Sequence, residues 1–327
     1  MKALQILQYG DFKDSLAINE IDKPTISKDD VLIEVMATSI NPIDKLLVLG
    51  YLKEMLPIPF PSTAGYDVSG IIVEKGAGVK SFKIGDLVYA RVPGEQMGTI
   101  AEYVSVNSAA VSVKPENISF EQAASIPLVG LTALQALESV NIKKNDKILV
   151  HAGSGGVGSF AIQYAKSKGA YVYTTTSTNN VEWVKALGAD RVIDYKTEDY
   201  KKIVKDADIV FDTLGDMYTA DAFQVIKQGG RVVSIIGALD EETAKMFGMT
   251  TYELPKEIAK GKEDKNAIYK YIFMNPNGTQ LAQIKTLIEG GKIKPIIDKI
   301  YSFSESVEAY THLASGRAKG KVIIKIK

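Results

Sequence analysis

The most constraining feature of this chain is a short apolar run that leads directly into a glycine-rich loop in mid-chain. The run is Lys147–Val150, and the loop carries the G-x-G-x-x-G spacing at Gly153, Gly155 and Gly158. An amphipathic segment at Phe160–Lys168 then predicts a helix. A strand, this loop and a helix in that order are typical of a dinucleotide-binding turn. An ordinary glycine-rich turn is the alternative, and the flanking strand and helix disfavour it.

Each glycine of the loop has an expected task. Gly153 permits a tight turn, Gly155 lets backbone amides approach a pyrophosphate, and Gly158 lets the helix pack closely on the strand. The phosphates are expected at the positive end of the helix, where N–H groups lack partners. The other loop residues expected to contact them are Ser154, Gly156 and Val157.

The residues after the second strand of this region indicate which dinucleotide is bound. NAD-specific domains place an acidic residue about 20 positions beyond the glycines, and residues 173–180 contain no carboxylate. The hydroxyls of Thr176 and Ser177 suit a 2′-phosphate, which favours NADPH over NADH. A run of threonines is also ordinary chemistry for a strand end. No cation stands at this strand end, so candidate cations come from further along the chain: Arg317 and Lys319.

Composition excludes several classes of protein. The 39 basic residues balance 39 acidic ones, so neither a nucleic acid nor an anionic membrane is the expected main partner. The chain has no cysteine, which excludes disulfides, a cysteine nucleophile and thiolate zinc sites. No apolar run approaches the roughly 20 residues that span a bilayer, and residues 1–7 alternate like a strand rather than a signal peptide. These features predict a soluble, cytoplasmic protein.

The secondary-structure pattern changes along the chain. The first third is rich in predicted strands, separated by turn signals; these are Val31–Ala37, Val68–Val73, Asp86–Arg91 and Ala101–Val106. A helical pattern covers Phe120–Ser139. From Lys147 onward strands and helices alternate, which is typical of a doubly wound parallel sheet. The tail predicts a helix at Gly278–Glu289 and a last strand at Lys321–Lys325, and we expect it to return to the first domain.

Several dispersed motifs in the right order resemble the medium-chain dehydrogenase/reductase superfamily, in its zinc-independent quinone oxidoreductase and enone reductase branch. Asn41–Asp44 is similar to the family's N-P-x-D segment. Glu121–Pro127 and Gly130–Ala133 are similar to its hinge-side helix, and Asp208–Gly215 and Gly320–Ile323 also fit. The resemblance covers almost the whole chain.

The resemblance implies an α/β fold in which a Rossmann sheet is inserted into a β-rich GroES-like catalytic domain. The expected domains are a GroES-like catalytic domain at 1–123, a Rossmann domain at 124–266, and a return segment at 267–327. A homodimer formed by edge pairing of two Rossmann sheets is also implied. Further cofactor contacts implied by the resemblance are Thr132, Tyr195, Leu214, Gly237 and Phe273. The family's usual lysine for the 2′-phosphate is replaced by Asn180.

The metal site of the zinc-dependent relatives is altered here. Their G-H-E-x2-G-x5-G-x2-V motif supplies a zinc-binding histidine, and Tyr66 occupies that place within Gly65–Gly70. The two histidines of the chain, His151 and His312, are expected to be structural or exposed. We therefore expect no metal.

The predicted activity is transfer of a hydride from NADPH to a quinone or to the C=C bond of an α,β-unsaturated carbonyl compound, because such substrates are electrophilic without a metal. The resemblance implies that Asn41 lies beside the nicotinamide and the reacting carbonyl, although an Asn before Pro42 also opens a turn. Tyr51 is expected to line the cleft and is a feasible, weak proton donor. Tyr66 either fills the vacated metal space or donates a hydrogen bond. Asp44 is expected to start a helix, and Asp67 to pair with its neighbours.

Two alternative functions stay open at this point. One is a zinc-free dehydrogenase or a reductase of another activated alkene, such as a haloacrylate or an acyl thioester. The other is a dinucleotide-binding protein with a structural, sensing or RNA-binding role, against which the balanced charge argues.

Overall fold

The computed structural model describes residues 1–327 and divides them into two compact units. The β-rich unit comprises 1–131, 275–291 and 295–327, and the doubly wound unit comprises 132–274 and 292–294. The boundaries predicted after residues 123 and 266 fall before the observed ones. The first differs because the division lies inside one continuous helix, α4 (Pro127–Ser139). The second differs because β14 (Ile268–Tyr271) completes the sheet of the doubly wound unit.

The doubly wound unit is built on a six-stranded parallel sheet with the order β11-β10-β9-β12-β13-β14. Its other strands are β9 (Lys147–Val150), β10 (Tyr171–Thr176), β11 (Arg191–Asp194), β12 (Ala207–Asp212) and β13 (Ile226–Ser234). β10 and β12 both flank β9, so the strand order reverses there. This arrangement confirms the predicted doubly wound sheet.

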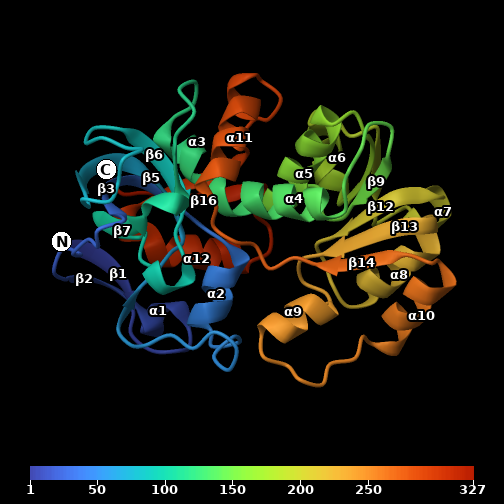
Figure 1. Ribbon diagram of the computed structural model, residues 1–327, viewed down its shortest axis with the longest axis horizontal. Helices are drawn as coiled ribbons and strands as arrows, with labels where there is room; N and C mark the ends of the chain where they lie inside the picture. The colour runs from blue at the N-terminus through green and yellow to red at the C-terminus, as the bar shows by residue number, and fades with distance from the viewer. The chain divides into compact units, whose positions relative to one another are not determined.

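Helices cover both faces of this sheet (Figure 1). α5 and α6 lie on one face, and α8 and α10 lie on the other. Parallel strands need such crossovers, which bury the sheet and explain why the strands are continuous apolar runs. The helices of the unit are α5 (Gly156–Ser167), α6 (Val181–Lys185), α7 (Tyr200–Ile203), α8 (Met217–Val225), α9 (Glu241–Met246) and α10 (Lys256–Asp264).

The β-rich unit contains a seven-stranded and a three-stranded sheet. The larger has the order β15-β16-β3-β5-β6-β8, with β7 also paired to β3, and the smaller has the order β2-β1-β4. The strands are β1 (Lys2–Ile6), β2 (Leu16–Glu20), β3 (Asp30–Ile40), β4 (Ser62–Thr63), β5 (Asp67–Lys75), β6 (Leu87–Arg91), β7 (Tyr103–Asn107), β8 (Val111–Val113), β15 (Ile297–Ser302) and β16 (Lys321–Lys325). β16 pairs with β3, which confirms that the tail returns to the first part of the chain.

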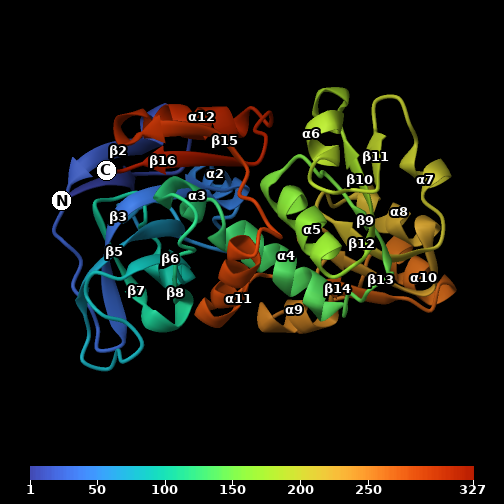
Figure 2. The ribbon, with the colours of Figure 1, turned by 90° about the horizontal axis from the view of Figure 1, so that it is seen from above.

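Five helices accompany these sheets: α1 (Phe12–Ser15), α2 (Pro42–Val48), α3 (Phe120–Ala124), α11 (Gly278–Glu289) and α12 (Ser306–Ala314). Figure 2 shows α12 along β15 and β16, and it also contacts α2. The hydroxyl of Tyr89 on β6 donates to the carbonyl of Leu281 on α11 at 2.6 Å, which ties that helix to the larger sheet.

The helix predicted over Phe120–Ser139 is wrong in one respect, because it is two helices. α3 ends at Ala124, and α4 begins at Pro127. Proline has no N–H to donate within a helix but fits the first helical turn, so the chain restarts there. The helix and the strand predicted in the tail, Gly278–Glu289 and Lys321–Lys325, have the predicted bounds. None of the helices combines the length and apolarity needed to cross a membrane.

Candidate functional site

The glycine loop connects β9 to α5 at the position where the strand order reverses. Ala152 adopts the left-handed conformation at φ 50°, so the sharpest point of the turn falls on this alanine. A side chain at Gly153 would collide with the hydroxyl of Thr174, and one at Gly158 would collide with the carbonyl of Ala152. The expectation that Gly153 makes the tight turn is therefore wrong, because the left-handed residue is Ala152. Gly153 and Gly158 are required by close packing inside the protein.

Gly155 differs from its neighbours because the protein leaves room beside it. For a Cβ atom added there, the nearest contact would be the carbonyl oxygen of Ala152 at 3.4 Å. Gly155 is also the N-cap of α5 and offers no side chain to the first helical turn. The first N–H groups of a helix have no partner within it, so this turn suits a phosphate that approaches the backbone. The residues present thus fit a pyrophosphate.

A buried carboxylate fixes the loops at the carboxyl ends of β12 and β13. Oδ1 of Asp212 accepts from the backbone N–H groups of Leu214 and Gly215 at 2.9 and 3.0 Å. Oδ2 accepts from the hydroxyl of Ser234 at 2.9 Å, and Ser234 in turn accepts from the N–H of Gly237 at 2.8 Å. Two predicted cofactor residues, Leu214 and Gly237, are therefore held at one edge of the sheet by Asp212, which the sequence analysis missed. Its position at the end of an apolar strand was the available signal.

The same edge brings the predicted ribose-binding residues together. Thr176 pairs with Asp194, and the N–H of Tyr195 donates to the carbonyl of Thr176 at 3.1 Å. Ser177 follows β10 directly, and Lys196 follows Tyr195 with its N–H bonded to Asp194 at 3.0 Å. The chain thus has a cation beside this strand end. The spacing after β10 does not indicate this cation, because Lys196 follows the neighbouring strand, β11.

His151 is buried directly before the glycine loop and shares a hydrogen-bond partner with it, the hydroxyl of Thr175. Its Nδ1 lies 3.2 Å from the hydroxyl of Thr175, and its ring packs edge-on against Tyr200 and Tyr218. Burial lowers the pKa of His151 to about 4, although Asp212 favours its charged form. The ring is therefore neutral at physiological pH, in agreement with the expected structural role. His312 is also occupied, by Tyr301 and Asp298.

In the β-rich unit, Asn41 lies in a buried polar cluster. It is the N-cap of α2, directly before Pro42, and Asp44, which was expected to start this helix, is its third residue. Its Nδ2 donates to Oδ2 of Asp67 at 2.9 Å, and its Oδ1 accepts from the ammonium of Lys321. The side chain is 1% exposed. The amide is thus fixed in one orientation by two partners of opposite charge.

Asp67 is the hub of this cluster, as its expected pairing with neighbours implies. Besides Asn41, its carboxylate accepts from the hydroxyl of Ser39 and the N–H of Leu128, both at 2.8 Å. Lys321 lies 3.4 Å from Oδ2 of Asp67 and also donates to the carbonyl of Ile40 at 3.2 Å. A buried carboxylate with this many donors is satisfied as an anion.

Asp44 is the less satisfied acid of the cluster. Its Oδ2 accepts from the N–H of Asn41 at 2.6 Å, while its Oδ1 is buried without a partner. Burial, aided by the nearby charge of Asp67, raises the pKa of Asp44 to about 7, although the Asn41 N–H, Lys321 and Arg91 favour its charged form. Asp44 therefore changes its protonation state near neutral pH.

The two tyrosines predicted to act at the site differ in environment. Tyr66 is 5% exposed within the apolar core, with the Arg91 guanidinium 4.5 Å from its ring centre. Burial raises its pKa to about 12, so it is a poor acid. Whether it fills the vacated space or donates a hydrogen bond stays a prediction. Tyr51 follows α2 and is 74% exposed. Its role as cleft lining or proton donor stays a prediction.

The remaining predicted cofactor residues fall in both units. Thr132 is buried in α4, and Phe273 packs edge-on against Phe247; all three residues belong to the doubly wound unit. Arg317 and Lys319 are exposed on the connection from α12 to β16, in the β-rich unit. Their contact with the 2′-phosphate stays a prediction.

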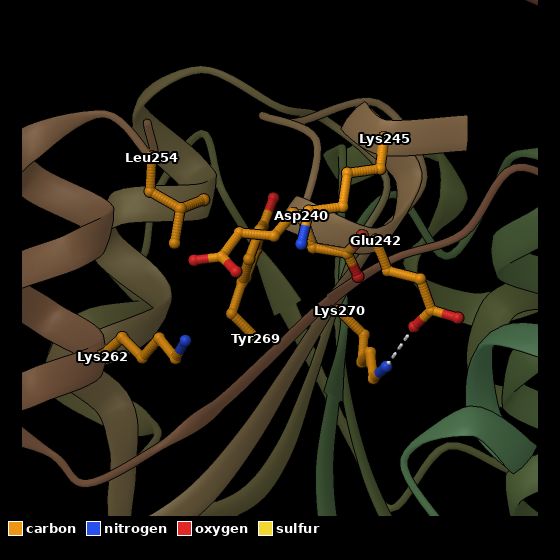
Figure 3. Close-up of a pocket in the computed structure, with 8 residues that line it drawn as sticks. Asp240, Glu242, Lys245, Leu254, Lys262, Tyr269 and Lys270 are labelled. Atoms are coloured by element: carbon orange, nitrogen blue, oxygen red, sulfur yellow. Dashed lines mark hydrogen bonds and ion pairs between the residues drawn. The ribbon is translucent and has the colours of Figure 1, made fainter. Parts of the chain in front are cut away.

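A pocket of about 360 Å³ lies beside α9, α10 and β14 in the doubly wound unit (Figure 3). It is lined by Asp240, Glu241, Glu242, Lys245, Leu254, Lys262, Tyr269 and Lys270. Its three carboxylates balance its three lysines, and Lys270 pairs with Glu242 at 3.0 Å. Asp240 is also used, since it accepts from the N–H groups of Thr243 and Tyr271. With no excess of either charge, this pocket has no feature that selects a cofactor phosphate.

The residues around Tyr66 do not fit a zinc ion. No group of three or more His, Cys, Asp or Glu side chains is placed to hold a metal. Tyr66 itself is a neutral phenol, and the oxygens of Asp67 accept from four other groups. Zinc requires three or four available N, S or O donors.

A β-rich unit joined to a doubly wound unit with a phosphate-binding turn defines a class, the dinucleotide-dependent dehydrogenases and reductases. Two family models match the chain: "Alcohol dehydrogenase GroES-like domain" over residues 27–116 and "Zinc-binding dehydrogenase" over residues 187–324.

Curated relatives and solved structures match the chain over nearly its full length. A 2-methylene-furan-3-one reductase of Solanum lycopersicum is 35% identical over 334 residues, covering 99% of this chain and 79% of the relative. A chloroplastic NADPH-dependent alkenal/one oxidoreductase of Arabidopsis thaliana has the same identity and coverage. The structure of a quinone oxidoreductase from Coxiella burnetii is 34% identical with a TM-score of 0.88, covering 100% of this chain and 99% of that one. The chain belongs to the medium-chain dehydrogenase/reductase superfamily, in its quinone oxidoreductase branch.

The contrast between Gly158 and Gly155 predicts two different defects. Gly158→Ala forces a methyl group against the Ala152 carbonyl, and we expect a loss of about 1–3 kcal/mol in the free energy of unfolding. Gly155→Ala is expected to lose at most about 1 kcal/mol of stability, as alanine is a poorer N-cap than glycine. It should weaken NADPH binding, because its methyl group occupies the space beside the helix N-terminus. Urea unfolding and NADPH fluorescence titration measure the two effects. Wild-type NADPH affinity in Gly155→Ala would contradict the assignment of this turn.

The raised pKa of Asp44 predicts that the stability of the protein depends on pH. Its pKa is about 7 in the folded protein and near 3.8 when unperturbed, so the native state binds more protons between these values. The free energy of unfolding therefore falls as pH rises from about 4 to 7, by roughly 1.4 kcal/mol for each unit of pKa difference, and levels off above 7. Asp44→Asn removes this contribution, so its stability relative to wild type should rise over that range. Urea unfolding at pH 5 and pH 8 measures it.

The control for this comparison is Asp22→Asn, which changes an exposed carboxylate. Its stability relative to wild type should not vary between the two pH values. A constant difference between wild type and Asp44→Asn at pH 5 and pH 8 would show that Asp44 does not titrate in this range.

Proposed function

We propose that this protein is a zinc-independent, NADPH-dependent reductase that transfers a hydride to a quinone or to the C=C bond of an α,β-unsaturated carbonyl compound. The observation that carries the proposal is the turn at Gly153–Gly158, placed where the strand order of the sheet reverses. In doubly wound sheets dinucleotides bind at this point. The names of the relatives, an alkenal/one oxidoreductase and a furanone reductase, support the substrate class.

The doubly wound unit would hold the cofactor through backbone and side chains at one sheet edge. The N–H groups at the start of α5 would bind the pyrophosphate, the loops fixed by Asp212 would support Leu214 and Gly237 against the dinucleotide, and Thr176, Ser177 and Tyr195 would bind the ribose phosphate. When bound, NADPH supplies the hydride. The protein then needs to orient the substrate and stabilise negative charge on its oxygen.

The β-rich unit contributes the polar groups for that second task. Asn41 is the proposed contact for the substrate oxygen, because its amide is held rigidly by Asp67 and Lys321. Tyr51 is proposed to line the substrate site. No step uses zinc, since the residues around Tyr66 do not supply a metal site, and a quinone or enone is electrophilic enough to accept hydride without one.

A homodimer is proposed through β14. This strand is the last of the six-stranded sheet, so one side of it has free backbone groups, and Ile268 on it is 50% exposed. An unpaired edge is a ready site for a second strand. Sedimentation velocity tests this, and a monomer at micromolar concentration would exclude it. Location in the cytoplasm stays a prediction from the sequence.

The test of the function is oxidation of NADPH, followed at 340 nm with quinones, alkenals, enones and other activated alkenes. We expect turnover with at least one quinone or enone and no loss of activity after treatment with a zinc chelator. A cofactor deuterated at C4 would show which substrate carbon receives the hydride. Tight NADPH binding without turnover of any substrate would favour the binding-protein alternative and reject the proposal.

The position of the Lys196 cation predicts that this protein prefers NADPH over NADH. Lys196, the cation beside Tyr195, is proposed to pair with the 2′-phosphate. Lys196→Ala should raise the dissociation constant of NADPH about tenfold, which corresponds to about 1.4 kcal/mol, and leave that of NADH unchanged. Lys202→Ala, an exposed lysine of the nearby helix α7, is the control. If Lys196→Ala weakened the binding of NADPH and NADH equally, the contact with the 2′-phosphate would have to come from other residues.

A further inference from the structure

Lys321 is an unusual residue for its position. It lies on β16, is 5% exposed, and its ammonium contacts three groups: Oδ1 of Asn41, the carbonyl of Ile40 and Oδ2 of Asp67. A buried lysine is costly unless it is paired and hydrogen-bonded. Burial lowers its pKa, while the carboxylates of Asp67 and Asp44 favour its charged form.

The contacts of Lys321 determine what Asn41 can present. Oδ1 of Asn41 is used by Lys321, and one hydrogen of Nδ2 is used by Asp67. An amide has two Nδ2 hydrogens, so one N–H of Asn41 remains without an acceptor. Rotating the amide by 180° would place Oδ1 against the Asp67 carboxylate and Nδ2 against the Lys321 ammonium, and both contacts would be repulsive. The cluster therefore fixes which atom is free.

We propose that Lys321 is a positioning residue for the reduction, which holds and polarises the Asn41 amide so that its free N–H donates to the oxygen of the substrate. This inference rests on the proposed function and adds a residue far from Asn41 in the sequence to the site. An ammonium on Oδ1 draws electron density from the amide and strengthens its N–H as a donor. A rigid donor of this kind stabilises negative charge that develops on the substrate oxygen without reorganisation during the reaction.

The central experiment is a double-mutant cycle between Lys321→Met and Asn41→Ala, read as kcat/KM for the best quinone or enone. Removal of one hydrogen-bond donor to a developing oxyanion costs about 100-fold or more, and we expect that for Asn41→Ala. Lys321→Met should cost about tenfold alone and less than twofold when Asn41 is already Ala. Interacting residues are non-additive in this way.

A binding readout accompanies the kinetics. 4-Nitrophenolate carries an oxygen anion on a conjugated ring and absorbs visible light, so its binding to the NADP⁺-saturated protein is measurable as an absorbance change. Lys321→Met and Asn41→Ala should each weaken it at least fivefold, while the NADPH dissociation constant stays within twofold of wild type. Replacing a residue that only stabilises the fold would not lower the affinity for 4-nitrophenolate while leaving the affinity for NADPH unchanged.

Lys114→Met is the matched control. Lys114 is buried in the same unit, with 6% exposure, and its ammonium donates to the carbonyls of Pro115 and Ile118 and does not contact Asn41. We expect less than a twofold change in kcat/KM and in phenolate binding. Should Lys321→Met fail to fold because Asp67 loses its counter-charge, the cycle is run in the Asp67→Asn background, where Asp67→Asn/Lys321→Met is compared with Asp67→Asn alone.

The outcomes separate the two proposals. Wild-type protein that reduces no quinone or enone removes the proposed function and this inference with it. Active wild-type protein with unchanged kcat/KM in Lys321→Met, or with losses that multiply fully with Asn41→Ala, overturns the role of Lys321 alone. Loss in Lys321→Met that disappears in the Asn41→Ala background supports it.

Discussion

The doubly wound unit depends on the pairing of β9 with a parallel strand on each side. β10 pairs with one side of this central strand and β12 with the other. The chain connections on the two sides therefore run away from each other and do not cover the carboxyl end of β9. The glycine loop lies there because it is the continuation of that strand. The proposed contacts of Thr176, Ser177, Tyr195, Leu214 and Gly237 follow from the same constraint, since parallel strands end at a common edge. The strand order thus decides where a ligand binds.

A second constraint operates in the β-rich unit, where polar groups are buried among apolar strands. Asp67, Lys321 and Asn41 form a cluster in which each charge has a partner and each hydrogen bond fixes another group. A pair of apolar residues would fill such a space at lower cost. The cluster gives a rigid amide at the start of α2 instead, and Asp44 beside it is left with an unpartnered oxygen. The Asn41 amide is thus rigid, while a carboxyl oxygen of its neighbour Asp44 stays without a hydrogen bond.

Much of the fold could be predicted because its signals are local. The apolar runs at β9, β11 and β16 and the amphipathic helix α11 repeat with the periods of strands and helices. The split between α3 and α4 was also local, since Pro127 marks it, yet the continuous helical pattern concealed it. The domain boundaries were less predictable, because β14 joins the six-stranded sheet only through its pairing with β13.

The sequence by itself determined the dinucleotide turn, the family and the replacement of the zinc-binding histidine by Tyr66, because each is a matter of residue type and spacing. Only the tertiary structure decided which distant side chains support these residues. Lys321 meets Asn41 and Asp67 because β16 pairs with β3, and Tyr195 bonds to Thr176 because β11 pairs with β10. Strand pairing joins residues that are far apart in the chain, and no local pattern records which strands will be neighbours.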